Sequence, residues 1–121
     1  MTGVGEWDGA FYLARRNGYE IRFVPGAGEA LDEVCNVDMW VIRDDGERWS
    51  GTVFTHDEVG RLLERRRGSG ECLDGGYFWA SDGLIVREPG IPAMVRVVDH
   101  LVETGEYTSV LQRLQPEDRE D

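Results

Sequence analysis

The chain alternates between two kinds of periodicity, and this alternation limits the folds open to it. Three times, two strand-like runs are joined by an Asn-Gly or Asp-Gly turn and followed by a segment with helical spacing. Pro-Gly pairs at Pro25 and Pro89 mark where the first and third units pass from strand to helix. The sequence therefore predicts three hairpin-then-helix units, with hairpin turns at Asn17-Gly18, Asp45-Gly46 and Asp82-Gly83.

The three helical segments differ in how clearly the sequence predicts them. The first is short, with apolar residues from Leu31 to Cys35 at helical spacing. The second begins with Thr55 and Glu58 in a capping-box pattern, and its apolar stripe comprises Val59, Leu62 and Leu63. The third has the longest stripe and ends at Gly105. That stripe consists of Ile91, Met94, Val95, Val98, Leu101 and Val102.

Together these segments predict an α+β fold. We expect an antiparallel sheet of about six strands with helices mainly on one face, because each element must bury its apolar side against another layer. A single domain covers residues 1–115, and the acidic segment 116–121 reads as a disordered tail.

The charge of the chain restricts its function. There are 24 acidic and 13 basic residues, for a formal charge of −11, and every basic residue is an arginine. Without lysine, Schiff-base and P-loop lysine chemistry is excluded. An acidic surface repels phosphate, which argues against nucleic acid and favours a protein partner with a cationic surface. Arginine in place of lysine is typical of GC-rich coding and points to a bacterial source.

No cofactor or metal site is expected from the sequence. Cys35, Cys72, His56 and His100 are scattered and do not have zinc-ligand spacing. No apolar run approaches the ~20 residues of a membrane span, and the first residues do not resemble a signal peptide. We therefore expect a cytoplasmic protein with reduced thiols.

If the protein is an enzyme, the catalytic candidates are His56, His100 and Asp57. His56 precedes Asp57 at the expected start of the second helix, where an imidazole can act as acid or base. His100 lies beside the apolar stripe of the third helix. The simpler interpretation of both is an exposed or boundary residue without a chemical role.

Carboxylates and aromatic residues are the candidates for binding a partner. Asp44, Asp45 and Glu47 cluster at the second hairpin turn, where Asp is also a common turn residue. Trp49 and Trp79 lie on expected strands, and aromatic side chains on a sheet face without helices would form an exposed patch. Trp40 alternates with Met39 and Val41 and so takes the opposite face from them.

The leading hypothesis is a small, acidic, non-catalytic protein-binding domain, such as an inhibitor or immunity-type protein that blocks a cationic partner. One alternative is a small enzyme or ligand-binding domain with a pocket between sheet and helices, in which a histidine or a carboxylate acts as acid or base. The other is a homodimeric accessory protein whose second subunit covers an open face.

Overall fold

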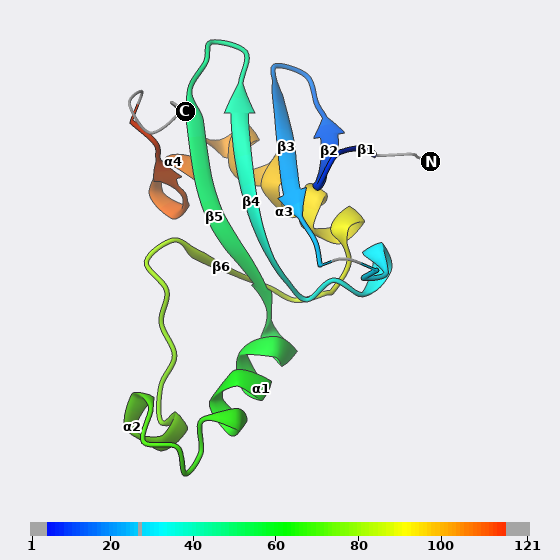
Figure 1. The fold of residues 1–121 in the computed structure, drawn as a ribbon. Helices are drawn as coiled ribbons and strands as arrows, with labels where there is room; N and C mark the ends of the chain where they lie inside the picture. Colours follow the sequence, from blue (N-terminus) through cyan, green and yellow to red (C-terminus); the bar gives the residue numbers. More distant parts are fainter. Residues whose placement is uncertain (1–4, 27, 116–121) are drawn as a thin grey trace.

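The computed structural model describes residues 5–26 and 28–115, so the predicted tail at 116–121 lies outside the described residues. The described strands are β1 (Gly5–Asp8), β2 (Phe11–Arg15), β3 (Tyr19–Val24), β4 (Asn36–Arg43), β5 (Arg48–Thr55), β6 (Gly83–Val86) and β7 (Gln112–Arg113). The helices are α1 (His56–Arg65), α2 (Cys72–Gly75), α3 (Ile91–Thr104) and α4 (Tyr107–Val110), with a 3-10 turn η1 at Leu31–Glu33. The fold is α+β, as predicted (Figure 1).

The strands form one open, mixed sheet in the order β1-β2-β3-β4-β5-β6, and β7 also pairs with β5. Neighbours from β1 to β5 are antiparallel, as is β7 with β5, whereas β6 runs parallel to β5. The predicted third hairpin at Asp82-Gly83 is therefore wrong. Residues 77–80 form no strand, and the chain enters β6 after an excursion through α1 and α2.

The first two predicted hairpins are present. β2 pairs with β3 around Asn17-Gly18, and β4 pairs with β5 around Asp45-Gly46. Gly18 and Gly46 have φ values of 92° and 95°, a region that glycine enters without a Cβ clash. Asn17 is not among the described residues with positive φ, so its turn is not the type I′ turn that Asn-Gly favours.

Helix α3 covers one face of the sheet and completes the core. Its predicted stripe is buried except for the half-buried Val102, and Gly105 ends the helix in the left-handed conformation. On the sheet side, the largest fully buried side chains are Ile21, Phe23, Met39, Val41 and Val53. Each of these side chains contributes roughly 1.5–3 kcal/mol by leaving water.

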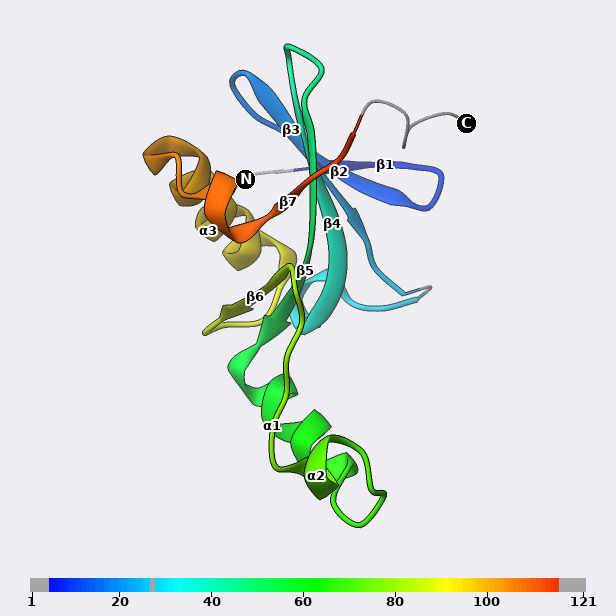
Figure 2. The same ribbon diagram turned by 90° about the vertical axis from the view of Figure 1, so that its left-hand side faces the viewer.

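Helix α1 does not cover the sheet. Thr55 caps it, with the Thr55 hydroxyl oxygen accepting a hydrogen bond from the Glu58 amide at 3.1 Å, but Val59, Leu62 and Leu63 are only half-buried. We call residues 56–82, which comprise α1, α2 and the loop that follows, the arm. Figures 1 and 2 both show the arm extending beyond the end of the sheet. The predicted first helix is also reduced to η1, so three equivalent hairpin-then-helix units do not form.

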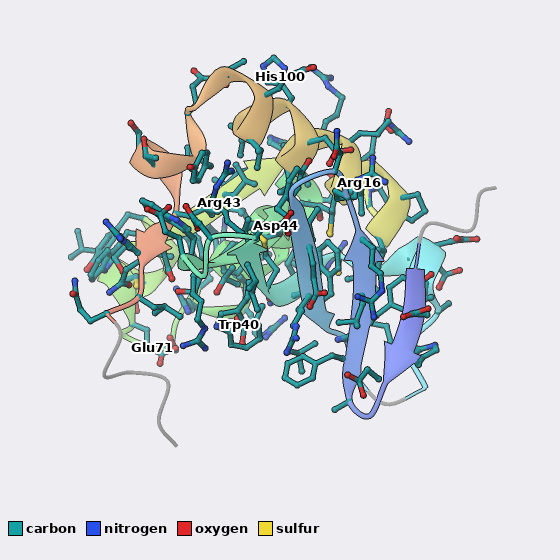
Figure 3. The ribbon with its side chains drawn as sticks, turned by 90° about the horizontal axis from the view of Figure 1, so that it is seen from above. Arg16, Trp40, Arg43, Asp44, Glu71 and His100 are labelled. Atoms are coloured by element: carbon teal, nitrogen blue, oxygen red, sulfur yellow. The ribbon has the colours of Figure 1, made fainter. Side chains whose placement is uncertain are left out.

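The sheet therefore has one covered and one uncovered face. Figure 2 shows α3 and α4 on the same side of the sheet, with no helix facing its other side. Trp40 lies on the uncovered face, opposite Met39 and Val41, as the alternation predicts (Figure 3). Its ring meets Phe11 edge to face, with 5.9 Å between the ring centroids.

Candidate protein-docking surface

The exposed large apolar side chains are concentrated in one part of the chain. Among the described residues, five such side chains are exposed: Trp7 (54%), Leu73 (82%), Tyr77 (48%), Trp79 (71%) and Ile85 (55%). Four of the five lie between Leu73 and Ile85, on the outer part of the arm and on β6. Contiguous exposed apolar surface on a soluble domain usually marks a contact with another molecule.

The backbone of α2 is held in an unusual conformation that exposes Leu73. Cys72, Leu73 and Asp74 have φ values of 49°, 54° and 58°, which an L-residue adopts only at an energetic cost. Strain of this kind persists where surrounding contacts enforce it, and it is common in ligand-binding segments. Here the Asp74 carboxylate accepts a hydrogen bond from the Gly70 amide at 2.6 Å.

Gly75 fixes α2 against α1. It has a φ of 84°, and a Cβ at this position would lie 2.2 Å from the Leu63 carbonyl oxygen. Only glycine permits this close approach of the two backbones. The position of α2 on the arm is therefore set by backbone contact.

Phe78 anchors the loop that follows α2. Its ring packs edge to face on Phe54 of β5, with 5.0 Å between centroids, and the Arg66 guanidinium lies 5.7 Å from the Phe78 centroid. Because Phe78 turns inward, its neighbours Tyr77 and Trp79 are left exposed. The aromatic run therefore divides into one anchor and two solvent-facing rings.

Carboxylates flank the exposed rings in the sequence. Residues 71–82 contain Glu71, Asp74 and Asp82 and no basic residue. We call this segment the acidic–aromatic loop. Arg66 of α1 lies 4.0 Å from Glu71, so Asp74 and Asp82 carry the remaining negative charge of the loop. Large apolar side chains together with negative charge are the chemistry that complements a cationic protein surface.

The acidic turn predicted as a partner-binding site lies elsewhere. Asp44, Asp45 and Glu47 are at the β4–β5 turn, at the opposite end of the sheet from the arm (Figure 1). Asp44 and Asp45 are exposed. Glu47 is half-buried, because its carboxylate accepts the Trp49 indole N–H at 3.2 Å and pairs with Arg113 at 3.3 Å. Two of the three carboxylates thus remain available to an incoming partner.

The two predicted tryptophan anchors do not share a surface. Trp49 is 7% exposed and packs edge to face on Tyr107 of α4, with 5.1 Å between centroids. It belongs to the core, and a partner that binds without rearrangement does not reach it. Trp79 is on a loop and not on a strand, and its indole is accessible.

The two histidines are exposed and lie on different helices. His56 pairs with Asp57, 3.6 Å from nitrogen to oxygen, and His100 lies 4.0 Å from Glu106. His100 points away from the sheet on the outer side of α3 (Figure 3). His56 and Asp57 line a hollow of about 590 Å³, and His100 lines another of about 330 Å³. The structure does not bring the two imidazoles into one hollow.

Both cysteines are half-buried next to arginine. The Cys35 sulfur lies 3.7 Å from a Glu58 carboxylate oxygen and accepts a hydrogen bond from Arg61 at 3.5 Å. The Cys72 sulfur accepts one from Arg66, also at 3.5 Å. Within residues 5–26 and 28–115, no three His, Cys, Asp or Glu side chains form a group that could hold a metal ion.

Sequence reasoning missed Leu73 and Ile85. The spacing around Leu73 does not indicate a left-handed turn, which depends on tertiary contact with α1. Ile85 was expected in a hairpin strand, whereas β6 lies at the edge of the sheet. Ile85 is exposed because its side chain takes the opposite sheet face from Val86, which is buried on the side of α3.

Comparison with known proteins identifies no relative. No protein-family model, curated protein or solved structure matches the chain. None of the helices in the described part of the chain is long and apolar enough to cross a membrane.

Proposed function

We propose that this protein is a non-catalytic binding domain that captures a protein partner with a cationic surface, as an inhibitor or immunity-type protein does. The observation that carries the proposal is the acidic–aromatic loop. This segment contains the exposed Leu73, Tyr77 and Trp79 and, interspersed with them in the sequence, three carboxylates. Tryptophan and tyrosine are enriched among residues that dominate binding energy, and carboxylates nearby select a basic partner.

The local construction of the loop supports this role. The packing of Phe78 on Phe54 and the close contact of Gly75 with α1 hold the loop in place before any partner arrives. A surface that is already ordered loses less conformational entropy on binding, so more of the contact energy appears as affinity.

The proposal is tested by comparing two exposed tryptophans. The protein, immobilised through a tag, is incubated with a lysate of its source organism, and the retained proteins are identified by mass spectrometry. We expect a basic protein that is retained by the wild type, released by salt and lost with Trp79→Ala. Trp7→Ala is the matched control, because Trp7 is also exposed but lies on β1, at the other edge of the sheet.

Crosslinking locates the contact. A photoreactive phenylalanine analogue at position 79 should link to the retained protein, and the same analogue at position 7 should not. Equal retention by both alanine variants, or crosslinking only from position 7, would refute the proposal.

A further inference from the structure

The outer edge of β6 is free. β6 is the last strand on its side of the sheet, and no described strand pairs with its outer edge. β7 does not cover it, because β7 pairs with β5 at Trp49 and Ser50, whereas β6 begins opposite Thr52. The backbone groups on that edge are therefore available to another strand.

The hydrogen-bond pattern identifies those groups. The Thr52 amide donates to the Asp82 carbonyl at 3.1 Å, and Thr52 is paired with Gly83 in the parallel ladder. In such a ladder, alternate residues of a strand direct both backbone groups toward the same neighbour. The backbone N–H and C=O groups of Leu84 and Val86 thus point toward β5, and those of Ile85 point away from the sheet.

The two edges of the sheet are protected differently. β1, at the far edge, carries Glu6 and Asp8, and Glu6 forms an ion pair with Arg15 at 2.9 Å. Charged side chains on an edge strand discourage pairing with another chain. β6 has the sequence GLIV with no charge, and Ile85 is 55% exposed. Both edge strands are short, with four residues each, but only the edge at β6 lacks charged side chains.

A hollow beside β6 could receive the side chains of an added strand. The hollow of about 330 Å³ lies between β6 and α3, and its apolar lining comes from Val86, Ala93 and Val97. Because the side chains of a strand alternate between faces, every second side chain of an added strand would enter this hollow. Small β-branched side chains suit a lining of alanine and valine.

The charges around β6 specify a further feature of the guest. Arg96 lies 3.9 Å from Glu88, and His56 lies 3.6 Å from Asp57. Arg87 lines both hollows next to β6 and takes part in none of the ion pairs within the described part of the chain. Arg87 is exposed, so a carboxylate on the guest strand can form an ion pair with it.

We propose that β6 binds an extended peptide segment of a partner, which adds a strand to the sheet, packs β-branched side chains against α3 and places a carboxylate beside Arg87. This interaction goes beyond the proposed function, because it uses the backbone edge of β6 and a guest of the opposite charge, whereas the proposed function rests on the side chains of the neighbouring acidic–aromatic loop. A second copy of the chain is a poorer guest, because pairing two chains of formal charge −11 brings like charges together.

A synthetic heptapeptide, TVTVEVT with blocked termini, is the probe. In an NMR titration of the isotope-labelled full chain, we expect the amide signals of Ile85 and Arg87 to shift and their hydrogen exchange to slow. A peptide with lysine in place of glutamate should bind about twofold to fivefold more weakly, the change expected for one exposed ion pair. A peptide N-methylated on every residue should not bind, because no N–H remains on either edge to complete the ladder.

Two variants distinguish the contribution of the β6 backbone from that of the Arg87 charge. Ile85→Pro removes an outward N–H and should abolish binding, with circular dichroism confirming the fold. Arg87→Gln should retain binding but remove the preference for glutamate over lysine. Arg15→Gln, an exposed arginine next to the opposite edge, is the matched control and should change neither.

Three results would overturn the proposal: equal binding of the N-methylated peptide, signal shifts confined to β1, or no binding of TVTVEVT at millimolar concentration. Sedimentation provides a separate check. A dimer that Ile85→Pro dissociates would identify a second copy as the occupant and would also overturn it.

Discussion

At the residue scale, Asp99 joins the first hairpin turn to helix α3. Arg16 and Tyr19 flank that turn, and both side chains bind the Asp99 carboxylate. The Tyr19 hydroxyl donates to it at 2.5 Å, and Arg16 Nε donates at 3.0 Å. Burial, followed by the hydrogen bond to Asp99, raises the pKa of Tyr19 to about 12. The protonated phenol is therefore favoured in the folded chain.

This shift predicts a stability change at alkaline pH. The folded pKa of Tyr19 exceeds the unfolded value of about 10, so its stabilising effect is complete below pH ~10 and is lost as the pH rises toward 12. Tyr19→Phe should be less stable than the wild type at pH 8, and the difference should shrink between pH 10 and pH 12. Thermal melts across this range measure it. A difference that does not vary with pH would contradict the assignment.

Two tryptophans should differ sharply in their effect on stability. Trp49→Ala removes a buried ring and should cost about 3–5 kcal/mol in the free energy of unfolding. Trp79→Ala removes an exposed ring and should change it by less than about 0.5 kcal/mol. Urea denaturation followed by circular dichroism distinguishes them. A large cost for Trp79→Ala would place that ring in a structural role and weaken the docking proposal.

At the element scale, the sequence predicted the elements that depend on interactions between residues close in the chain. The two hairpins, the cap at Thr55 and the stripe of α3 follow from turn chemistry, capping and periodicity, and the structure confirms them. The parallel pairing of β5 with β6 could not be predicted, because it joins strands separated by the whole arm. The sequence also could not show that α1 extends away from the sheet, because a half-buried apolar stripe has the same spacing as a buried one.

Helix α3 provides the test of the predicted core. Leu101→Ala should cost about 2–5 kcal/mol, the usual range for a buried leucine, because Leu101 is 8% exposed near the end of the helix. Its neighbour Glu103 is exposed, and Glu103→Ala should change stability by less than about 0.5 kcal/mol. Chemical denaturation measures both. An effect near zero for Leu101→Ala would mean that this turn of α3 does not contribute to the core.

At the scale of the whole molecule, the candidate site was only partly predictable. Composition indicated an acidic protein with accessible aromatic residues, and Trp79 and the carboxylates at Asp44 and Asp45 are indeed exposed. Their arrangement depends on the fold. The turn and helix α2 lie toward opposite ends of the molecule, because the chain leaves the end of β5 into the arm (Figure 1), whereas the acidic–aromatic loop returns to the middle of β5 at Asp82. The sequence alone does not show how far apart the turn carboxylates and the carboxylates of the arm lie in the fold.

The separation predicts which carboxylates steer a cationic partner. Asp82 lies beside Thr52, four residues along β5 from the turn end at Arg48, which is roughly 13 Å and still exceeds the Debye length of ~10 Å at 0.1 M salt; Glu71 lies farther away, on the arm. For the basic protein recovered by affinity capture, Glu71→Arg with Asp82→Arg should slow association more than Asp44→Arg with Asp45→Arg. Trp79→Ala should instead speed dissociation, since anchors act in the desolvated centre of an interface. Surface plasmon resonance at 0.1 M and 1 M salt measures these rates, and the wild-type association rate should fall about tenfold or more as steering is screened. A larger loss of association rate from the turn variant would move the docking surface to the β4–β5 end of the sheet.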